Sequence, residues 1–330
     1  MRFPPIWPGM IDTKHLDAAL APVAAGRAST RAKEGRVDII LDVTGLPEAT
    51  RDALEQDVRS AAAAVAGVAE VRIARTQSRV RRKLIAVASG KGGVGKSTVS
   101  ANLAVALAKG GRATGLVDAD IYGPSQPVLM GVAGTRPQAR DKTLIPVPTA
   151  YDVPLLSMGQ LVDPGKALAW RGPMAGGALG QLIDADWGEI DTLVLDLPPG
   201  TGDVQLTMVQ KHKPAGAVIV CTPQDLALID ARRAIDLFAK TDVPIIGIVE
   251  NMAGYACPEC GAISDPFGRG GAEAAAQEMG VPFLGRIPLD IAIRTQSDAG
   301  TPPASGNGPQ ARAFGKIGEK VADWLGTLKG

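Results

Sequence analysis

Histidine and cysteine, two of the side chains that bind transition metals best, are scarce in this chain. Its 330 residues include two histidines and three cysteines. Three cysteines are too few for a disulfide framework, and His15 and His212 are too few and too scattered to build a metal site. Cys257 and Cys260 are spaced C-x-x-C, whereas Cys221 stands alone in an apolar run.

A charge excess and a long apolar run are also missing. Lysine and arginine (35) nearly balance aspartate and glutamate (34), so neither a basic field for nucleic acid nor an acidic tail is indicated. No apolar run approaches the roughly 20 residues that span a bilayer, and Met1–Met10 contains prolines but no apolar signal core. We therefore expect a soluble, cytoplasmic protein that binds neither membrane nor nucleic acid.

The length suits one large domain and a small one. Residues 1–76 predict a small α+β domain. Arg36–Val43 alternates like a strand, Pro47–Ala66 has the pattern of an amphipathic helix, and Val68–Ala74 is another short strand. Residues 77–83 form a basic linker, which we interpret as solvated rather than as a binding patch.

Residues 84–330 alternate between strand-like and helical segments, which predicts a doubly wound α/β domain with a mostly parallel sheet. The apolar runs are typical of strands buried on both faces. The expected strands are Leu84–Ser89, Ala113–Asp118, Thr192–Asp196, Ala217–Thr222 and Pro244–Glu250, and the clearest helices are Ser97–Lys109, Leu226–Lys240 and Pro309–Leu328.

A phosphate-binding loop follows the first of these strands. Gly90–Thr98 reads GKGGVGKST and fits G-x-x-x-x-G-K-[ST] between a strand and a helix, the context that the motif requires. Glycines let backbone N–H groups surround phosphate oxygens, Lys96 supplies charge to the terminal phosphates, and the Ser97 hydroxyl suits Mg²⁺. The predicted nucleotide-binding residues of the loop are Gly90, Lys91, Gly92, Gly93, Val94, Gly95, Lys96, Ser97 and Thr98.

Lys91 is a second lysine in this loop, and an ordinary phosphate loop does not need it. The variant resembles the deviant Walker A motif of dimeric ATPases that include MinD, ParA, the nitrogenase iron protein and the Mrp/ApbC carriers. The resemblance implies a homodimer in which Lys91 reaches the nucleotide of the partner subunit and assists phosphoryl transfer, much as an arginine finger does.

Acidic residues end two of the expected strands, where open α/β sheets place their ligands. Either Asp118 or Asp120 could hold Mg²⁺ or orient the attacking water. The resemblance favours Asp120 for the water and Asp118 for the metal. Asp196 begins the segment DLPPGTGD, which resembles a Walker B and switch II region and implies a place in the outer coordination sphere of Mg²⁺.

Two segments bear on the base of the nucleotide. Lys240-Thr-Asp242 is similar to the guanine-binding N-K-x-D motif, but Ala239 replaces the asparagine, so we interpret it as a helix end. In the resembled family an asparagine after a later strand contacts adenine, and Asn251 occupies that place. ATP is therefore the predicted nucleotide.

The pair Cys257 and Cys260 has three interpretations. A thioredoxin-like redox pair places its first cysteine at a helix N-terminus, and no helix is evident after Gly261. A zinc site within one chain needs four ligands, and this neighbourhood offers two. Two chains about a twofold axis supply four thiolates, enough for one [4Fe–4S] cluster or one zinc ion, and the expected dimer favours this interpretation.

Several segments, in order and spacing, resemble the Mrp/ApbC/Nbp35-type iron–sulfur cluster carrier ATPases. They are Gly90–Thr98, Asp118–Ser125, Trp170–Met174, Trp187–Asp203 and Glu250–Gly261. The resemblance implies a homodimer that holds a labile [4Fe–4S] cluster and passes it to apo iron–sulfur proteins, with ATP binding and slow hydrolysis tuning loading and release. The small N-terminal domain is similar to one linked to iron–sulfur maturation, but Thr44–Glu48 lacks its usual cysteine, which leaves a docking role.

Two other functions compete with the carrier. One is a MinD/ParA-like spatial regulator that binds membrane or DNA, and the other is a zinc-bridged ATPase without a redox cofactor. A membrane helix should be basic and strongly amphipathic, whereas Gly315–Lys329 mixes lysines with acidic residues, so we expect it to pack on the domain's own sheet.

Cys221 is expected to be a small buried hydrophobic residue.

Overall fold

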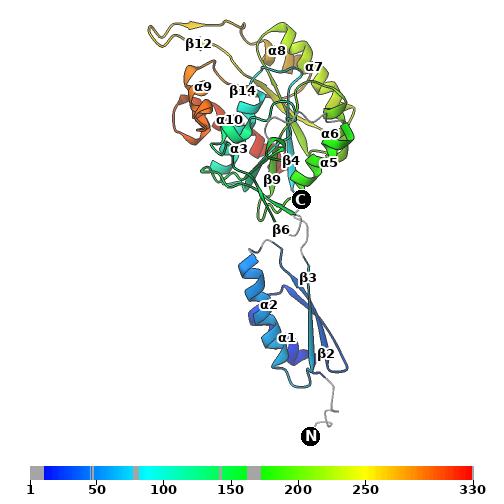
Figure 1. Ribbon diagram of the computed structural model, residues 1–330. Helices are drawn as coiled ribbons and strands as arrows, with labels where there is room; N and C mark the ends of the chain where they lie inside the picture. Colours follow the sequence, from blue (N-terminus) through cyan, green and yellow to red (C-terminus); the bar gives the residue numbers. More distant parts are fainter. Residues whose placement is uncertain are drawn as a thin grey trace. The chain divides into compact units, whose positions relative to one another are not determined.

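The computed structural model describes residues 11–44, 46, 48–76, 82–140, 143–161 and 172–328. The chain divides into two compact units, residues 1–81 and 82–330 (Figure 1). Each unit has a hydrophobic core of its own. Met1–Met10, most of the predicted linker and Trp170–Arg171 lie outside the described residues.

The first unit packs two helices against a three-stranded sheet. Its elements are α1 (Thr13–Ala24), β1 (Ala28–Lys33), β2 (Arg36–Asp42), α2 (Glu48–Ala63) and β3 (Glu70–Thr76). Strand β2 lies in the middle, antiparallel to β1 and parallel to β3. Val37, Ile39 and Leu41 alternate inward from β2 and pack with Leu16 and Val58 of the helices. Sequence analysis missed β1, because the residues of this edge strand, ASTRAK, show no strong apolar alternation.

The second unit is built on a seven-stranded sheet in the order β14-β11-β10-β4-β9-β5-β8, in which every pair of neighbours is parallel. Its strands are β4 (Lys83–Ala88), β5 (Thr114–Asp118), β8 (Leu155–Ser157), β9 (Thr192–Asp196), β10 (Gly216–Cys221), β11 (Ile245–Glu250) and β14 (Phe283–Arg286). All five predicted strands are present, and the doubly wound α/β fold is confirmed. Strands β8 and β14 were missed, because three or four residues are too short for a periodic signal.

Helices cover both faces of this sheet (Figure 1). One face is packed by α3 and α10, whose core contacts include Leu103 and Phe314, and the other by α5, α6, α7 and α8, with Leu179 and Phe238 among the buried side chains. The bounds are α3 (Lys96–Lys109), α5 (Gly172–Ile183), α6 (Asp203–His212), α7 (Asp225–Ala239), α8 (Gly271–Glu278) and α10 (Pro309–Thr327). Strands buried from both sides explain their unbroken apolar sequences.

Smaller elements connect these layers, and two pairs of short strands form antiparallel hairpins. The elements are α4 (Gln126–Leu129), β6 (Gln138–Arg140), β7 (Thr143–Ile145), η1 (Met158–Gln160), β12 (Tyr255–Ala256), β13 (Ile263–Ser264), α9 (Ile291–Asp298) and η2 (Pro303–Ser305). The β12–β13 hairpin, which holds the C-x-x-C pair in its turn, extends from the body of this unit (Figure 1).

The last helix belongs to the core. Phe314, Ile317 and Val321 of α10 are buried, and a Cβ on Gly318 would lie 2.8 Å from the Cβ of Ala106 in α3. Its apolar face is therefore used against its own domain, as expected. Among the described residues, no helix is both long and apolar enough to cross a bilayer.

We predict that a chain beginning at Arg82 folds and binds nucleotide without residues 1–81, since the second unit has its own core. Thermal unfolding and ATP affinity, compared with the full chain, provide the test. Aggregation of the shortened chain with loss of binding would mean that residues 1–81 complete the core.

A second prediction concerns His212, which packs at the end of α6 with its Nε2 3.0 Å from the carbonyl oxygen of Gly176 in α5. Burial lowers the pKa of His212 below the ordinary value of 6.5. As the pH falls below about 6.5, His212 is protonated more readily in the unfolded chain than in the folded one. The free energy of unfolding therefore decreases as the pH falls. In His212→Gln, the melting temperature should fall less between pH 7 and pH 5.5 than in the wild type. An identical fall in both proteins would contradict this role.

Candidate functional site

The phosphate loop joins the central strand β4 to helix α3. Gly93 and Gly95 have φ angles of 81° and 80°, in the left-handed region that favours glycine. A Cβ on Gly95 would lie 2.2 Å from Nδ2 of Asn251, so the loop approaches the end of β11 closely. Only a glycine fits there, and the loop is shaped to present backbone N–H groups.

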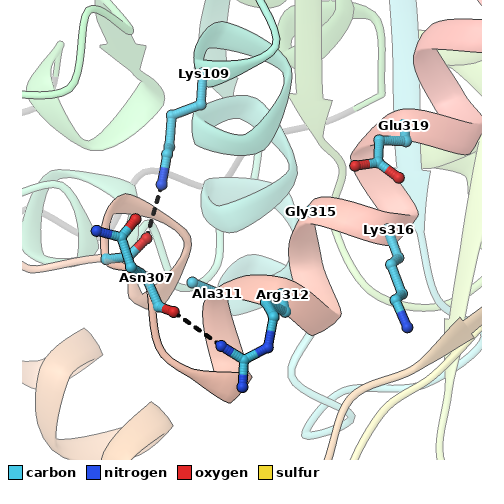
Figure 2. Close-up of a pocket in the computed structure, with 8 residues that line it drawn as sticks. Lys109, Asn307, Ala311, Arg312, Gly315, Lys316 and Glu319 are labelled. Atoms are coloured by element: carbon cyan, nitrogen blue, oxygen red, sulfur yellow. Dashed lines mark hydrogen bonds between the residues drawn. The ribbon is translucent and has the colours of Figure 1, made fainter.

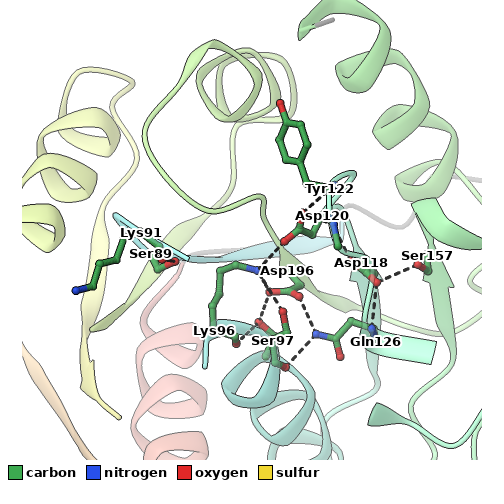
Figure 3. A network of polar contacts seen from close by, with 12 residues as sticks. Ser89, Lys91, Lys96, Ser97, Asp118, Asp120, Tyr122, Gln126, Ser157 and Asp196 are labelled. Carbon is green, nitrogen blue, oxygen red and sulfur yellow. Dashed lines mark hydrogen bonds and ion pairs between the residues drawn. The ribbon is translucent and has the colours of Figure 1, made fainter. Parts of the chain in front are cut away.

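A buried ion pair lies at the start of α3. Lys96, the first residue of the helix, points its Nζ at Oδ1 of Asp196, 2.5 Å away, at the end of β9 (Figure 3). The same carboxylate accepts hydrogen bonds from Ser100 Oγ and from Gln126 Nε2, each at 2.8 Å. Asp120 is farther from Lys96, at 3.9 Å. Lys96 is thus within 4 Å of the carboxylates of both Asp120 and Asp196 at the carboxyl edge of the sheet.

Asp118 lies beside this pair and is completely buried. Its carboxylate accepts hydrogen bonds from the backbone N–H of Gln126 at 3.1 Å, the hydroxyl of Ser157 at 2.9 Å and the N–H of Asp120 at 3.2 Å. Burial, followed by the nearby charge of Asp196, raises the pKa of Asp118 to about 7. A carboxylate that is buried beside a second carboxylate is stabilised by a nearby positive charge, such as a divalent cation.

Gln126 and Ser157 were missed as site residues. Gln126 is fully buried, and its Nε2 bridges the carbonyl oxygen of Ser97 at 3.0 Å and the carboxylate of Asp196. It directly follows the DADIYGPS segment, and this neighbouring motif was the one feature of the sequence that could have pointed to Gln126. Ser157 comes from β8, a strand that was not predicted, so nothing in the sequence placed it near Asp118. Both side chains hold carboxylates in fixed orientations.

Lys91 lies within the loop and Asn251 lies beside it, and their side chains point in different directions relative to the site. Figure 3 shows the Lys91 side chain directed away from Lys96 and the carboxylates, so it does not serve the site of its own chain in this state. Asn251 is buried at the end of β11, where its Nδ2 donates to the carbonyl oxygen of Val94 at 2.8 Å. The structure brings Asn251 to the phosphate loop, and its contact with adenine stays a prediction.

A magnesium-bound nucleotide fits this edge of the sheet. The glycine cradle leaves no space for a side chain at Gly95, and the carboxylates exceed the positive charge that Lys96 supplies. Mg²⁺ usually keeps several waters and takes one or two carboxylates together with phosphate oxygens. Ser97, Asp118 and Asp196 are the residues that would hold it.

The C-x-x-C pair forms the turn of the β12–β13 hairpin. The N–H of Cys257 donates to the carbonyl oxygen of Ala262, and the N–H of Gly261 donates to the carbonyl oxygen of Cys257, both at 2.9 Å. Backbone N–H groups of Cys260 and then Glu259 point at the Cys257 sulfur and lower the pKa of its thiol. The turn therefore stabilises the thiolate, the form that binds metal.

One chain does not complete a metal centre at this turn. Within the described ranges, no group of three or more His, Cys, Asp or Glu side chains is placed to hold an ion. Cys221 is buried in β10, and burial raises the pKa of its thiol to about 12, so it is a neutral core residue as expected. The Lys240–Asp242 segment follows the last residue of α7, in agreement with its interpretation as a helix end.

A separate depression of about 390 Å³ lies between the end of α3 and the first turns of α10 (Figure 2). Lys109 lines it and donates to the carbonyl oxygen of Gly306 at 2.7 Å, while Arg312 donates to that of Asn307 at 3.1 Å. Helix α3 has 14 residues, so this depression lies about 20 Å from the phosphate loop. It is not part of the nucleotide site.

The fold and the phosphate loop together define a P-loop NTPase of the MinD-like class. Among solved structures, MinD of Pyrococcus furiosus, a cell division ATPase, matches with a TM-score of 0.56 and 26% identity, over 73% of this chain and 99% of that one. A nucleotide-binding protein of Archaeoglobus fulgidus, solved with ADP and found to contain cobalt, matches with a TM-score of 0.62 and 40% identity, over 70% and 91% of the two chains.

Residues 80–322 match the family model described as ParA, NUBPL iron-transfer P-loop NTPase, and the chain belongs to this family. An iron–sulfur cluster carrier protein of Pseudomonas fragi is 53% identical over 226 residues, 68% of this chain and 78% of that protein. A mitochondrial iron–sulfur protein of Arabidopsis thaliana, required for NADH dehydrogenase, is 47% identical over 75% and 80% of the two chains. The predicted resemblance is confirmed.

Substitution of either loop lysine should impair hydrolysis, but only one of the two substitutions should lower stability. In Lys96→Ala the buried carboxylate of Asp196 loses its counter-ion, which should cost the nucleotide-free protein about 3–5 kcal/mol of stability and abolish hydrolysis. Lys91→Ala should leave the melting temperature unchanged, because this side chain points away from the site, while lowering hydrolysis on the order of 10³-fold.

Chemical denaturation and ATP turnover measure these effects, with each variant as the control for the other. Near-normal turnover in Lys96→Ala would contradict its contact with the phosphates. An equal loss of stability in both variants would contradict the importance of the Lys96–Asp196 pair.

Proposed function

We propose that this protein is an ATP-dependent iron–sulfur cluster carrier that binds a [4Fe–4S] cluster between two copies of the chain and transfers it to apo-proteins. The observation that carries the proposal is the turn at Cys257 and Cys260, which stabilises a thiolate but supplies only two sulfur ligands. Two copies supply four, the number that a [4Fe–4S] cluster requires. Relatives named as cluster carriers support the same cargo.

The nucleotide half of the proposal assigns roles to the residues at the carboxyl edge of the sheet. Bound Mg²⁺ would supply charge neutralisation for the phosphates. Lys96 leaves Asp196 and binds the terminal phosphates, while Gln126 keeps the Asp196 carboxylate oriented. Asp120 orients the attacking water, and Lys91 extends to the nucleotide of the partner subunit. Exclusion of bulk water by the second copy strengthens each of these charge interactions.

ATP is the proposed nucleotide, because Asn251 lies at the phosphate loop and the chain has no N-K-x-D motif for guanine.

Residues 1–76 are proposed to dock partner proteins rather than to bind metal. These residues include no cysteine. A docking domain on the same chain as the carrier would raise the effective concentration of a recipient protein.

Variants of the three cysteines test the cargo. Cys257→Ala/Cys260→Ala should remove the cluster after anaerobic reconstitution and leave ATP affinity intact, because the turn contributes no residue to the phosphate loop. Cys221→Ala is the matched control and should keep a full cluster, since its thiol is buried and neutral. Iron, sulfide and zinc per dimer are measured beside ATP affinity.

The outcomes separate the competing functions. Zinc without sulfide in the wild type would favour the zinc-bridged ATPase. A full cluster in the double variant would refute the carrier function and favour the MinD-like regulator, whose discriminating feature would then be membrane or DNA binding.

A further inference from the structure

The cysteine turn belongs to a long excursion of the chain that leaves the sheet at β11 and returns at α8. Its outgoing end follows Glu250, the last residue of β11, and its returning end enters α8 at Gly271. Asn251, the first residue of the excursion, donates to Val94 in the phosphate loop. The excursion thus starts at the nucleotide site and carries the metal-binding turn.

The side chain of Glu250 joins the two ends of this excursion. Its Oε2 accepts a hydrogen bond from the backbone N–H of Ala272 at 2.9 Å, in the first turn of α8. Its Oε1 accepts from Nε of Arg286 in β14 at 2.8 Å. Glu250 is fully buried, so its contact with Ala272 is shielded from water, whereas Arg286 reaches the carboxylate from a half-exposed position.

Arg286 extends the same contact to the surface of α8. Its Nη2 donates to Glu273 at 2.6 Å, and its guanidinium group lies over the ring of Phe283, 5.2 Å from the centroid. One arginine therefore binds β11 through Glu250 and α8 through Glu273. Its planar fork suits two carboxylates better than a lysine does.

Backbone contacts hold the outgoing strand of the excursion to the same edge. The N–H of Ala253 donates to the carbonyl oxygen of Ile287, and the N–H of Leu289 donates to that of Gly254, both at 2.9 Å. The outgoing end is held by these contacts, whereas the returning end is held to β11 through the Glu250 carboxylate. A hairpin held at both ends follows a movement of β11, whereas one held at a single end can swing independently.

We propose that Glu250 and Arg286 are a positioning pair through which the nucleotide controls the metal-binding turn. Nucleotide entering the phosphate loop displaces Asn251, β11 carries Glu250 with it, and Glu250 moves the start of α8 together with the outgoing strand. Neither residue belongs to the phosphate loop or to the cysteine turn. This inference rests on the proposed function for its purpose, but its physical content is the coupling of two segments of one chain.

Hydrogen exchange of residues 255–264 in the full-length protein, with and without a non-hydrolysable ATP analogue and Mg²⁺, measures this coupling. In the wild type the analogue should change exchange in the hairpin by about fivefold or more. In Glu250→Gln the change should disappear, because an amide has one acceptor oxygen and cannot accept from both Ala272 and Arg286, while analogue affinity stays the same. Asp298→Asn, which removes an exposed carboxylate paired with Arg294 in α9, is the matched control and should respond like the wild type.

Arg286→Lys provides a second variant if Glu250→Gln does not fold. It keeps the charge opposite Glu250 and loses the fork that also reaches Glu273, so its response should be reduced. A response of wild-type size in either folded variant overturns the proposal, and so does a wild-type hairpin that ignores the nucleotide.

Binding of Co²⁺ to the cysteine pair, followed by thiolate absorption, is recorded for each protein. It should be unchanged in Glu250→Gln. Failure of the wild type to bind metal would defeat the carrier function while leaving the exchange experiment valid, so the two failures are distinguishable.

Discussion

The contact between Lys96 and Asp196 is the interaction on which the site depends. It joins the first turn of α3 to the end of β9 across the centre of the sheet, with both side chains buried. An isolated buried carboxylate would be very unfavourable, so the loop lysine stabilises the fold in addition to its proposed role in phosphate binding. Gln126, Ser100 and Asp118 are arranged around this pair, and the site is in place before any nucleotide arrives.

In the proposed function, the phosphates of the nucleotide compete with Asp196 for this lysine. With Lys96 on the phosphates, Asp196 would need another partner, and a hydrated Mg²⁺ would supply the positive charge. Asp118, whose pKa burial and Asp196 raise to about 7, responds to the same change in charge. Under this proposal, exchange of one cation for another at a buried site is the means by which a small ligand would alter the carboxyl ends of neighbouring strands.

Much of the fold and part of the site could be predicted from the sequence. Doubly buried strands give unbroken apolar runs, and Gly90–Thr98 combines a motif with its required context, so β4, the loop and α3 were assigned to within a few residues. The carboxylates Asp118 and Asp196 were found because parallel strands end at one edge. Gln126, Ser157 and Glu250 were not found, since their importance comes from side-chain contacts with residues that are between 22 and 70 positions away in the sequence. The edge strand β1 lacks the pattern that burial on two faces produces, and β8, although buried, is only three residues long.

The burial of Cys221 has a practical consequence for chemistry on this protein. With its pKa near 12 and its sulfur inside β10, this thiol is inert to alkylating reagents at neutral pH as long as the domain is folded. The chain has only two other thiols, and both lie in the exposed hairpin turn. If Cys257 and Cys260 hold the cargo as proposed, the number of thiols that react in the native protein counts free cysteine ligands directly, and each chain without cargo should show two.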